Sequence, residues 1–178
     1  MIHVLLNALA ERMNDFLSSY YDRAEVMVEA GVIDAAPDED QTDKILLSIT
    51  NIERETAMGI NNRFNKGQDM SVQRASPPWH LNIYLMVAAV FSPKRYMESV
   101  QILSDTISFL QQNSNLSLPG ISNVTIEPVS TSPQELSNIW SILGGHYYPS
   151  ILCKIRMITF DGSEIKEIKT RIRERHIN

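Results

Sequence analysis

The side chains that could perform catalysis or bind a metal are few and scattered along this sequence. No histidine has a zinc-ligand partner at short spacing, whether His3, His80, His146 or His176. Cys153 lies within an apolar run, whereas a nucleophilic thiolate needs an accessible, electropositive position. The motifs GxSxG and GxGxxG do not occur, and no pair of carboxylates has a catalytic pattern. The residues therefore predict no enzyme activity, no metal and no cofactor.

Two stretches suggest ligand chemistry but lack its full pattern. Asp38-Glu39-Asp40 resembles part of a calcium loop, yet the spaced oxygen ligands, central glycine and final glutamate of an EF-hand are missing. A solvated hairpin turn explains this acidic stretch better. Residues 66–69, KGQD, lack the glycine spacing and ending of a P-loop. A ligand- or metal-binding protein, with a site between subunits around Glu53, His80 and His146, stays open as an alternative.

Composition limits the class of protein. The 178 residues, 43% of them hydrophobic, predict one domain with a core of normal size. A net charge of −5 argues against general nucleic-acid binding. The single cysteine excludes an intramolecular disulfide and fits a reducing compartment. The first residues lack a signal peptide's basic region and cleavage site, so we expect synthesis in the cytoplasm.

The apolar run at residues 81–91, LNIYLMVAAVF, predicts the middle strand of the fold. Only Asn82 and Tyr84 carry polar side-chain atoms, so both faces of the strand are mainly apolar. Such a strand is covered on both sides, by other elements or by a partner subunit. The run is shorter than the about 20 apolar residues of a membrane-spanning helix, and we expect no membrane contact.

Other periodicities predict the elements around this strand. Strands are expected at residues 26–32, 44–56, 121–129 and 151–160, and a loop at 113–120. In the second strand Ile45, Leu47 and Ile49 should share one face, and Leu46, Ser48, Thr50 and Ile52 the other. Apolar steps of three and four predict helices at residues 2–21, 93–112 and 133–143.

Stripes and caps further define these helices. The first helix has a stripe from Ile2 to Tyr20, whereas the second has Tyr96, Val100, Leu103, Ile107 and Leu110. Ser92 and Pro93 suit the N-cap and first position of the second helix, and residues 132–135, SPQE, form a capping box for the third. The prediction is an α/β (α+β) fold, a single domain with a mixed central β-sheet flanked by helices. It covers residues 1–161, with a long loop at 57–76 and a basic C-terminal tail at 162–178.

Two basic segments and two aromatic residues are candidates for contact with partners. The long loop offers Arg63, Phe64, Lys66 and Arg74, and the tail offers Lys166, Lys169, Arg171, Arg173 and Arg175. The tail is either a solvated end or an arm that docks on an acidic neighbour, and it suits a helix or an edge strand. Tyr147 and Tyr148 are candidate interface aromatics, whereas Trp140 is expected in the core.

Several short sequence segments resemble those of the cap, or tail-terminator, family of phage-tail-like contractile injection systems. They are Asn51-Ile52-Glu53 at a strand end, Pro78 with His80-Leu81-Asn82-Ile83-Tyr84 at a strand start, and ELSNIWS at residues 135–141 followed by Gly144, Gly145, Tyr147, Pro149 and Ser150. Their order and spacing are similar to the family's from the first helix to about Phe160.

The resemblance implies a structural role. Such caps form a hexameric ring on the distal end of the inner tube and sheath, where they stop polymerisation and tie sheath to tube. The expected partners are therefore other copies of the chain, the tube protein and the sheath protein, in a particle that can leave the cell. A sheath or tube adaptor of a related secretion apparatus stays open as an alternative, because it would bind sheath without capping a tube.

Overall fold

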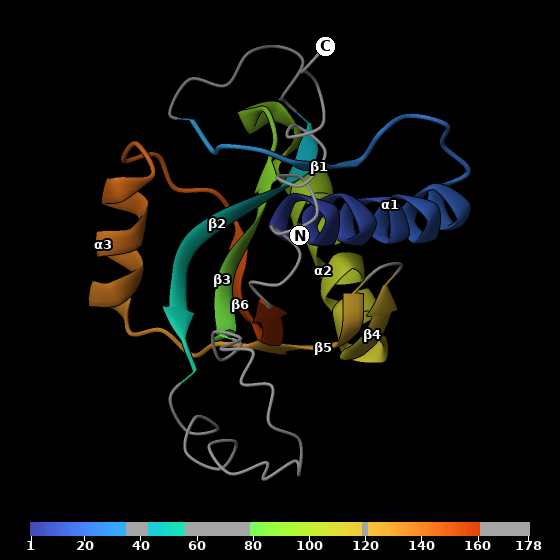
Figure 1. Cartoon of the computed structure of the whole chain (residues 1–178). Coiled ribbons are helices and arrows are strands. Elements are labelled where there is room, and N and C mark those ends of the chain that lie inside the picture. The colour runs from blue at the N-terminus through green and yellow to red at the C-terminus, as the bar shows by residue number, and fades with distance from the viewer. Residues whose placement is uncertain (35–42, 56–78, 119–120, 161–178) are drawn as a thin grey trace, which may run out of the picture.

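The computed structural model of the chain describes residues 1–34, 43–55, 79–118 and 121–160 (Figure 1). In chain order its elements are α1 (Ile2–Tyr21), β1 (Val28–Ala30), β2 (Lys44–Arg54), β3 (Trp79–Val90), the 3₁₀ turn η3 (Pro93–Arg95), α2 (Tyr96–Gln112), β4 (Asn115–Leu118), β5 (Ile121–Pro128), α3 (Pro133–Ile142) and β6 (Ser150–Phe160). The strands form one sheet in the order β1-β2-β3-β6-β5-β4. β1 is parallel to β2 and the other neighbours are antiparallel. The predicted α+β fold with a mixed sheet is confirmed.

β3 is the central strand, as the sequence predicts. It pairs with β2 along one edge and with β6 along the other. Every side chain from Leu85 to Val90 is at most 1% exposed. Both edges and both faces of this stretch are therefore covered, which is the environment that its lack of charge predicted.

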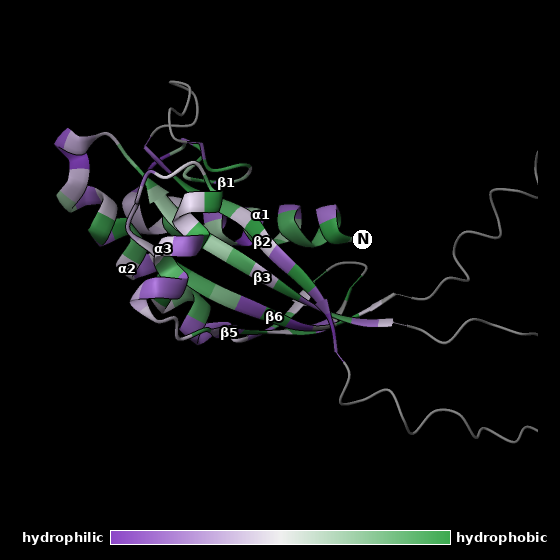
Figure 2. Ribbon diagram, turned by 90° about the vertical axis from the view of Figure 1, so that its left-hand side faces the viewer, coloured by the Kyte–Doolittle hydropathy of each residue, from purple (hydrophilic) through white to green (hydrophobic). Residues whose placement is uncertain are grey.

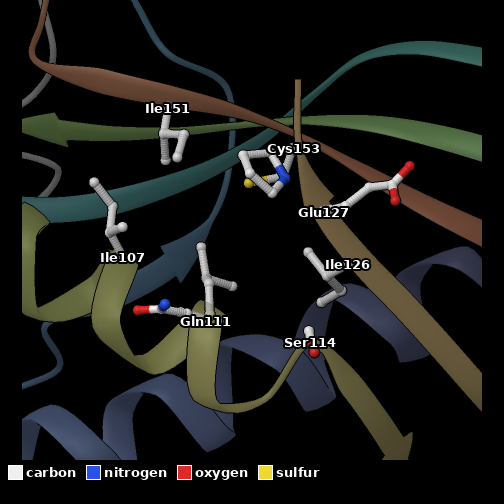
Figure 3. Close-up of a pocket in the computed structure, with 9 residues that line it drawn as sticks. Ile107, Gln111, Ser114, Ile126, Glu127, Ile151 and Cys153 are labelled. Atoms are coloured by element: carbon white, nitrogen blue, oxygen red, sulfur yellow. The ribbon is translucent and has the colours of Figure 1, made fainter. Parts of the chain in front are cut away.

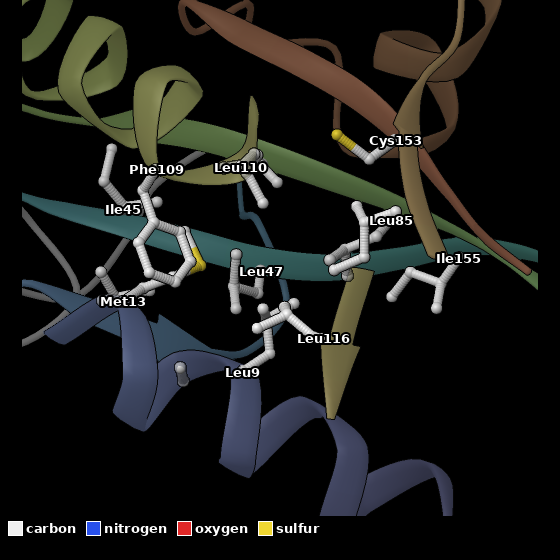
Figure 4. Close-up of a cluster of buried hydrophobic side chains, with 14 of the residues drawn as sticks. Leu9, Met13, Ile45, Leu47, Leu85, Phe109, Leu110, Leu116, Cys153 and Ile155 are labelled. Atoms are coloured by element: carbon white, nitrogen blue, oxygen red, sulfur yellow. The ribbon is translucent and has the colours of Figure 1, made fainter. Parts of the chain in front are cut away.

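The sheet separates two apolar clusters. The larger lies between the sheet and helices α1 and α2, and includes Leu47 and Leu85 (Figure 4). The smaller includes Leu46 and Met86 together with Trp140 of α3. Figure 1 shows α3 on one side of β2, β3 and β6, and α1 and α2 on the other. Neighbouring residues of one strand enter opposite clusters because side chains alternate across a strand.

Helix α1 has the predicted bounds and also holds the edge strand β1. The Asn14 Oδ1 accepts the backbone N–H groups of Met27 and Val28, each at 2.8 Å, and its Nδ2 donates to the Val28 carbonyl at 2.6 Å. The predicted stripe is wrong at its last residue, because Tyr20 is 65% exposed. The chain turns away there through Asp22, whose φ is 52°.

The predicted apolar stripe of α2 is partly wrong. Tyr96 and Ile107 are exposed, whereas the buried side chains are Ser99, Ile102, Leu103, Thr106, Phe109 and Leu110. Ser99 and Thr106 are polar, so a prediction based on the spacing of apolar residues did not identify this buried face of the helix. Their hydroxyls donate to carbonyls of the same helix, Ser99 to Tyr96 at 2.6 Å and Thr106 to Ile102 at 2.8 Å, so their burial leaves no unpaired donor.

The start of α2 also differs from the prediction. Ser92 makes no side-chain cap bond, and residues 93–95 form the turn η3 before the α-helix begins. Arg95 holds this corner, donating to Glu98 at 2.6 and 2.7 Å and pairing with Asp43 at 2.7 Å. The ion pairs therefore join the start of β2 to the start of α2.

The two edge strands differ from the prediction. β1 is limited to Val28–Ala30, and both Val26 and Val32 are exposed. β4 lies where a loop was expected; it pairs with β5 and buries Leu116 and Leu118 in the larger cluster. Its sequence, NLSL, has little β-propensity of its own, so the pairing and the core decide its conformation.

Removal of a core side chain from α1 tests this packing. Leu9→Ala should lower the free energy of unfolding by about 2–5 kcal/mol, because the side chain is 0% exposed and a cavity would remain. The matched control is Val4→Ala on the same helix, where the residue is 40% exposed and the loss should be well under that of Leu9→Ala. Urea unfolding measures both, and equal losses would contradict the described core.

Candidate contact surfaces

The predicted contact residues of the long loop and of the tail lie outside the described residues, so they stay predictions. Of the two tyrosines, Tyr147 is 59% exposed but Tyr148 is only 7% exposed. Tyr148 packs in the cluster under α3, with its ring centroid 6.0 Å from that of Trp140. Of this pair, Tyr147 presents its ring at the surface and Tyr148 is buried within the chain, so Tyr147 is the better placed for contact with a partner, and the interface role stays a prediction.

Helix α3 and the turn after it place Tyr147. The predicted capping box is present, with Ser132 and Glu135 each bonding the other's backbone N–H. Gly144 and Gly145 end the helix with φ values of 102° and 80°, a conformation that glycine adopts without strain. Trp140 is buried as expected, and Tyr147 meets it edge-on at 5.6 Å between ring centroids. The tyrosine is therefore held by the tryptophan while most of it faces outward.

A bulge in β2 decides which of its side chains lie on the sheet face that carries α3, in the part of that face that α3 does not cover. The register with β3 shifts between Ile49 and Asn51, so that Ile52 pairs with Ile83 and Glu53 with Asn82. The predicted face of Ile52 is therefore wrong, because the extra residue reverses the alternation beyond it. Figure 2 shows β2 changing from mainly hydrophobic to hydrophilic toward this end.

The bulge brings a polar cluster together across three strands. The Glu53 Oε1 accepts hydrogen bonds from the Tyr84 hydroxyl and from the Lys154 Nζ, both at 2.9 Å. The same Nζ lies 5.2 Å from the centroid of the Tyr84 ring. Beside them, the Asn82 Nδ2 donates to Glu55 at 2.9 Å. This half of the sheet face, which α3 does not cover, thus carries charges that are already paired within the chain.

The pairing shifts the acid-base equilibria of the cluster. The hydrogen bond from Lys154, followed by that from Tyr84, lowers the pKa of Glu53 below its usual value. The hydrogen bond to Glu53 in turn raises the pKa of Lys154. Both groups therefore stay charged at neutral pH.

A second candidate surface is an apolar groove between α2 and the strands β5 and β6, which the sequence did not reveal (Figure 3). It has a volume of about 430 Å³. Ile107, Ile126 and Ile151 line it from the three elements, and Cys153 lies at its base. The exposure of Ile107, which the predicted stripe had placed in the core, is the consequence of this opening.

Cys153 is buried packing, as the sequence predicts. Its side chain is 1% exposed, and burial raises the pKa of the thiol to about 12. A thiol with so high a pKa is a poor nucleophile near neutral pH.

The residues of the alternative metal site do not meet within one chain. His80 pairs with Thr159 at one end of β3, and its Nδ1 lies 3.2 Å from the threonine hydroxyl. His146 precedes Ser150, which pairs with Ala88 toward the other end of β3. In the described ranges no group of three or more His, Cys, Asp or Glu is placed to hold a metal ion.

None of the helices in the described part of the chain is long and apolar enough to cross a membrane.

The polar cluster predicts a pH-dependent contribution to stability. Because the pKa of Glu53 is lower in the folded chain than its usual value of 4.5, the contribution is complete above that value and is lost as pH falls through the lower folded pKa. Glu53→Gln should therefore be less stable than the natural chain at pH 7, with the difference shrinking as pH falls below 4.5, the usual pKa of the carboxyl group. Urea unfolding across this range measures it, with Glu11→Gln on α1 as control. A difference that persists in acid would contradict the ionic origin.

The buried thiol predicts slow modification. Cys153 should react with a thiol reagent at pH 8 only after unfolding, because the side chain is covered and protonated. Thiol titration with and without denaturant measures this. Rapid reaction of the folded chain would show that the base of the groove is open.

Comparison with known proteins places this fold. The family model for the Pvc16 N-terminal domain matches residues 3–174. A search of curated proteins finds no match. Among solved structures, the chain is similar to the sheath/tube terminator, in its extended state, of the extracellular contractile injection system PVC, with 15% identity and a TM-score of 0.51 over 86% of this chain and 56% of that one.

It is also similar to the tube-terminating cap of the anti-feeding prophage, with 15% identity and a TM-score of 0.50 over 85% of this chain and 53% of that one. At this identity the two structures show a shared fold, and the chain spans just over half the length of each. The family match, in contrast, covers nearly all of the sequence and confirms the resemblance to caps of contractile injection systems. The chain therefore belongs to the Pvc16 N-terminal domain family.

Proposed function

We propose that this chain is the cap, or tail terminator, of a contractile injection system. In this role it forms a hexameric ring on the distal end of the inner tube and sheath, ends polymerisation and anchors sheath to tube. The observation that carries the proposal is the family match over residues 3–174, joined to the same fold in a sheath/tube terminator and a tube-terminating cap. The role is structural and needs no catalytic group.

The described surface suits such an assembly. A ring needs head-to-tail contacts between different patches of identical subunits. The chain offers different patches, namely the edge strands β1 and β4 at opposite ends of the sheet, the exposed Tyr147, and the apolar groove. The loop at 57–76 and the basic tail at 162–178 are further proposed contacts with neighbouring subunits, tube or sheath.

Synthesis in the cytoplasm, followed by incorporation into a particle that is released from the cell, completes the proposal. The comparisons give no support to an adaptor or to a ligand- or metal-binding protein.

Mass and tube binding test the proposal together. Light scattering on the purified chain, alone and with the tube protein of its own system, should give six times the mass of one chain, either free or on tube ends. Electron microscopy of growing tubes should show rings at tube ends and shorter tubes than in the absence of the chain, because capped ends stop growing. Sheath binding without any effect on tube length would point to an adaptor. A monomer that ignores both proteins would overturn the proposal.

A further inference from the structure

The groove between α2, β5 and β6 is an apolar site that the described part of the chain leaves open. Ile107, Ile126 and Ile151 project into it from three elements, and the side chain of Glu127 at its rim points away (Figure 3). Its volume of about 430 Å³ lies within the roughly 300–1,000 Å³ of sites that bury a ligand or a few side chains. A groove of this size and apolar lining has room for a few apolar side chains.

The tail has the sequence pattern that fits such a groove. Ile165, Ile168 and Ile172 follow each other at steps of three and four, so a helix would present all three on one face. An amphipathic helix that binds a groove uses anchors at this spacing. A helix is therefore the better of the two forms that the tail pattern allows, because the groove receives side chains from one face.

Charge also favours contact between the tail and the rest of the chain. Residues 162–178 hold five Lys and Arg against three Asp and Glu, whereas residues 1–161 hold eleven against eighteen. The tail is thus basic and the remainder is acidic, by seven charges net. Opposite net charge steers the two together, with the isoleucines providing the short-range contact.

The direction of β6 favours a contact between two chains. The groove lies at Ile151 and Cys153 near the start of β6, and the tail follows Phe160 at its end. From Phe160 back to Cys153 the strand covers about 23 Å, whereas Ile165, five residues on, reaches at most about 18 Å. Ile165 therefore falls short of Ile151 and Cys153 in its own chain. Even fully extended it reaches at most the level of Ile155, where Ile126 lines the near rim of the groove. The chain would also have to reverse direction after Phe160, which shortens this reach.

We propose that the tail of one copy of this chain docks as a helix in the α2–β5–β6 groove of the next copy, with Ile165, Ile168 and Ile172 as its anchors. Donor and acceptor surfaces differ, so the contact is head-to-tail and can close into a ring. The inference deepens the proposed function, on which it rests for the neighbouring copy.

Cysteine pairs between two chains test the docking directly. Ile107→Cys marks the groove of one chain and Ile168→Cys marks the tail of another, while the native Cys153 can remain because it is 1% exposed. The two variants, one enlarged by an affinity tag, are mixed with and without tube protein under mild oxidation. A mixed disulfide dimer should form in several-fold higher yield than in a control mixture with Ile142→Cys. Ile142 is 85% exposed on α3, on the other face of the sheet.

The outcomes separate the alternatives. Equal yields from the groove and control mixtures, or no dimer with or without tube protein, would overturn the docking. A chain with both substitutions that closes on itself at high dilution would overturn the contact between copies.

A second measurement does not depend on cysteine. Ile168→Glu should weaken self-association roughly tenfold or more, since a buried isoleucine is replaced by a charge, whereas Ile168→Leu should leave it nearly unchanged. Light scattering over a concentration series measures both variants, and unchanged association of Ile168→Glu would overturn the proposal. If the chain binds tube but the mixed disulfide does not form, the cap function stands and the docking is refuted. If the mixed disulfide forms but the chain does not bind tube, the docking stands and the cap function is refuted.

Discussion

The burial of β3 is the constraint on which the rest of the structure depends. A buried strand needs a partner for each backbone N–H and C=O group, and β2 and β6 supply these on its two edges. Because both faces of β3 are apolar, the sheet also needs cover on both sides. α1 and α2 provide it on one face and α3 on part of the other. The two-sided packing of the domain thus follows from one strand that cannot meet water.

The incomplete cover by α3 divides the second face of the sheet into two halves. Under the helix lie Met86 and Leu152; beyond it lie Tyr84 and Lys154, two residues further along the same faces of β3 and β6. The bulge in β2 adds Glu53 to the polar half, where its carboxylate binds both groups. A partner over this half meets groups that are already hydrogen-bonded, so its charges favour correct orientation more than tight binding. An apolar surface such as the groove is a better candidate for tight binding of a partner.

A ring of this domain needs contacts that run in one direction. The start of β6 borders the groove, and its last residue, Phe160, precedes the tail, so the proposed docking would join opposite ends of this strand in neighbouring copies. A surface at one end that fits a different surface at the other is a head-to-tail arrangement. β6 therefore both completes the core and, in the proposed docking, runs from the groove toward the residues that precede the tail.

The sequence by itself determined the central strand, the three helices and the inert cysteine, because long apolar runs, steps of three and four, and caps are local signals. It also contains the short segments that resemble the cap family. It did not determine β4, the buried face of α2 or the side of Ile52. β4 depends on pairing with β5, the buried face of α2 includes hydroxyls such as that of Thr106 that bond their own helix, and the side of Ile52 depends on the bulge in β2. None of these three features produces a periodic pattern in the sequence. The groove and the Glu53–Tyr84–Lys154 cluster join residues far apart in the chain, so only the tertiary structure decided them.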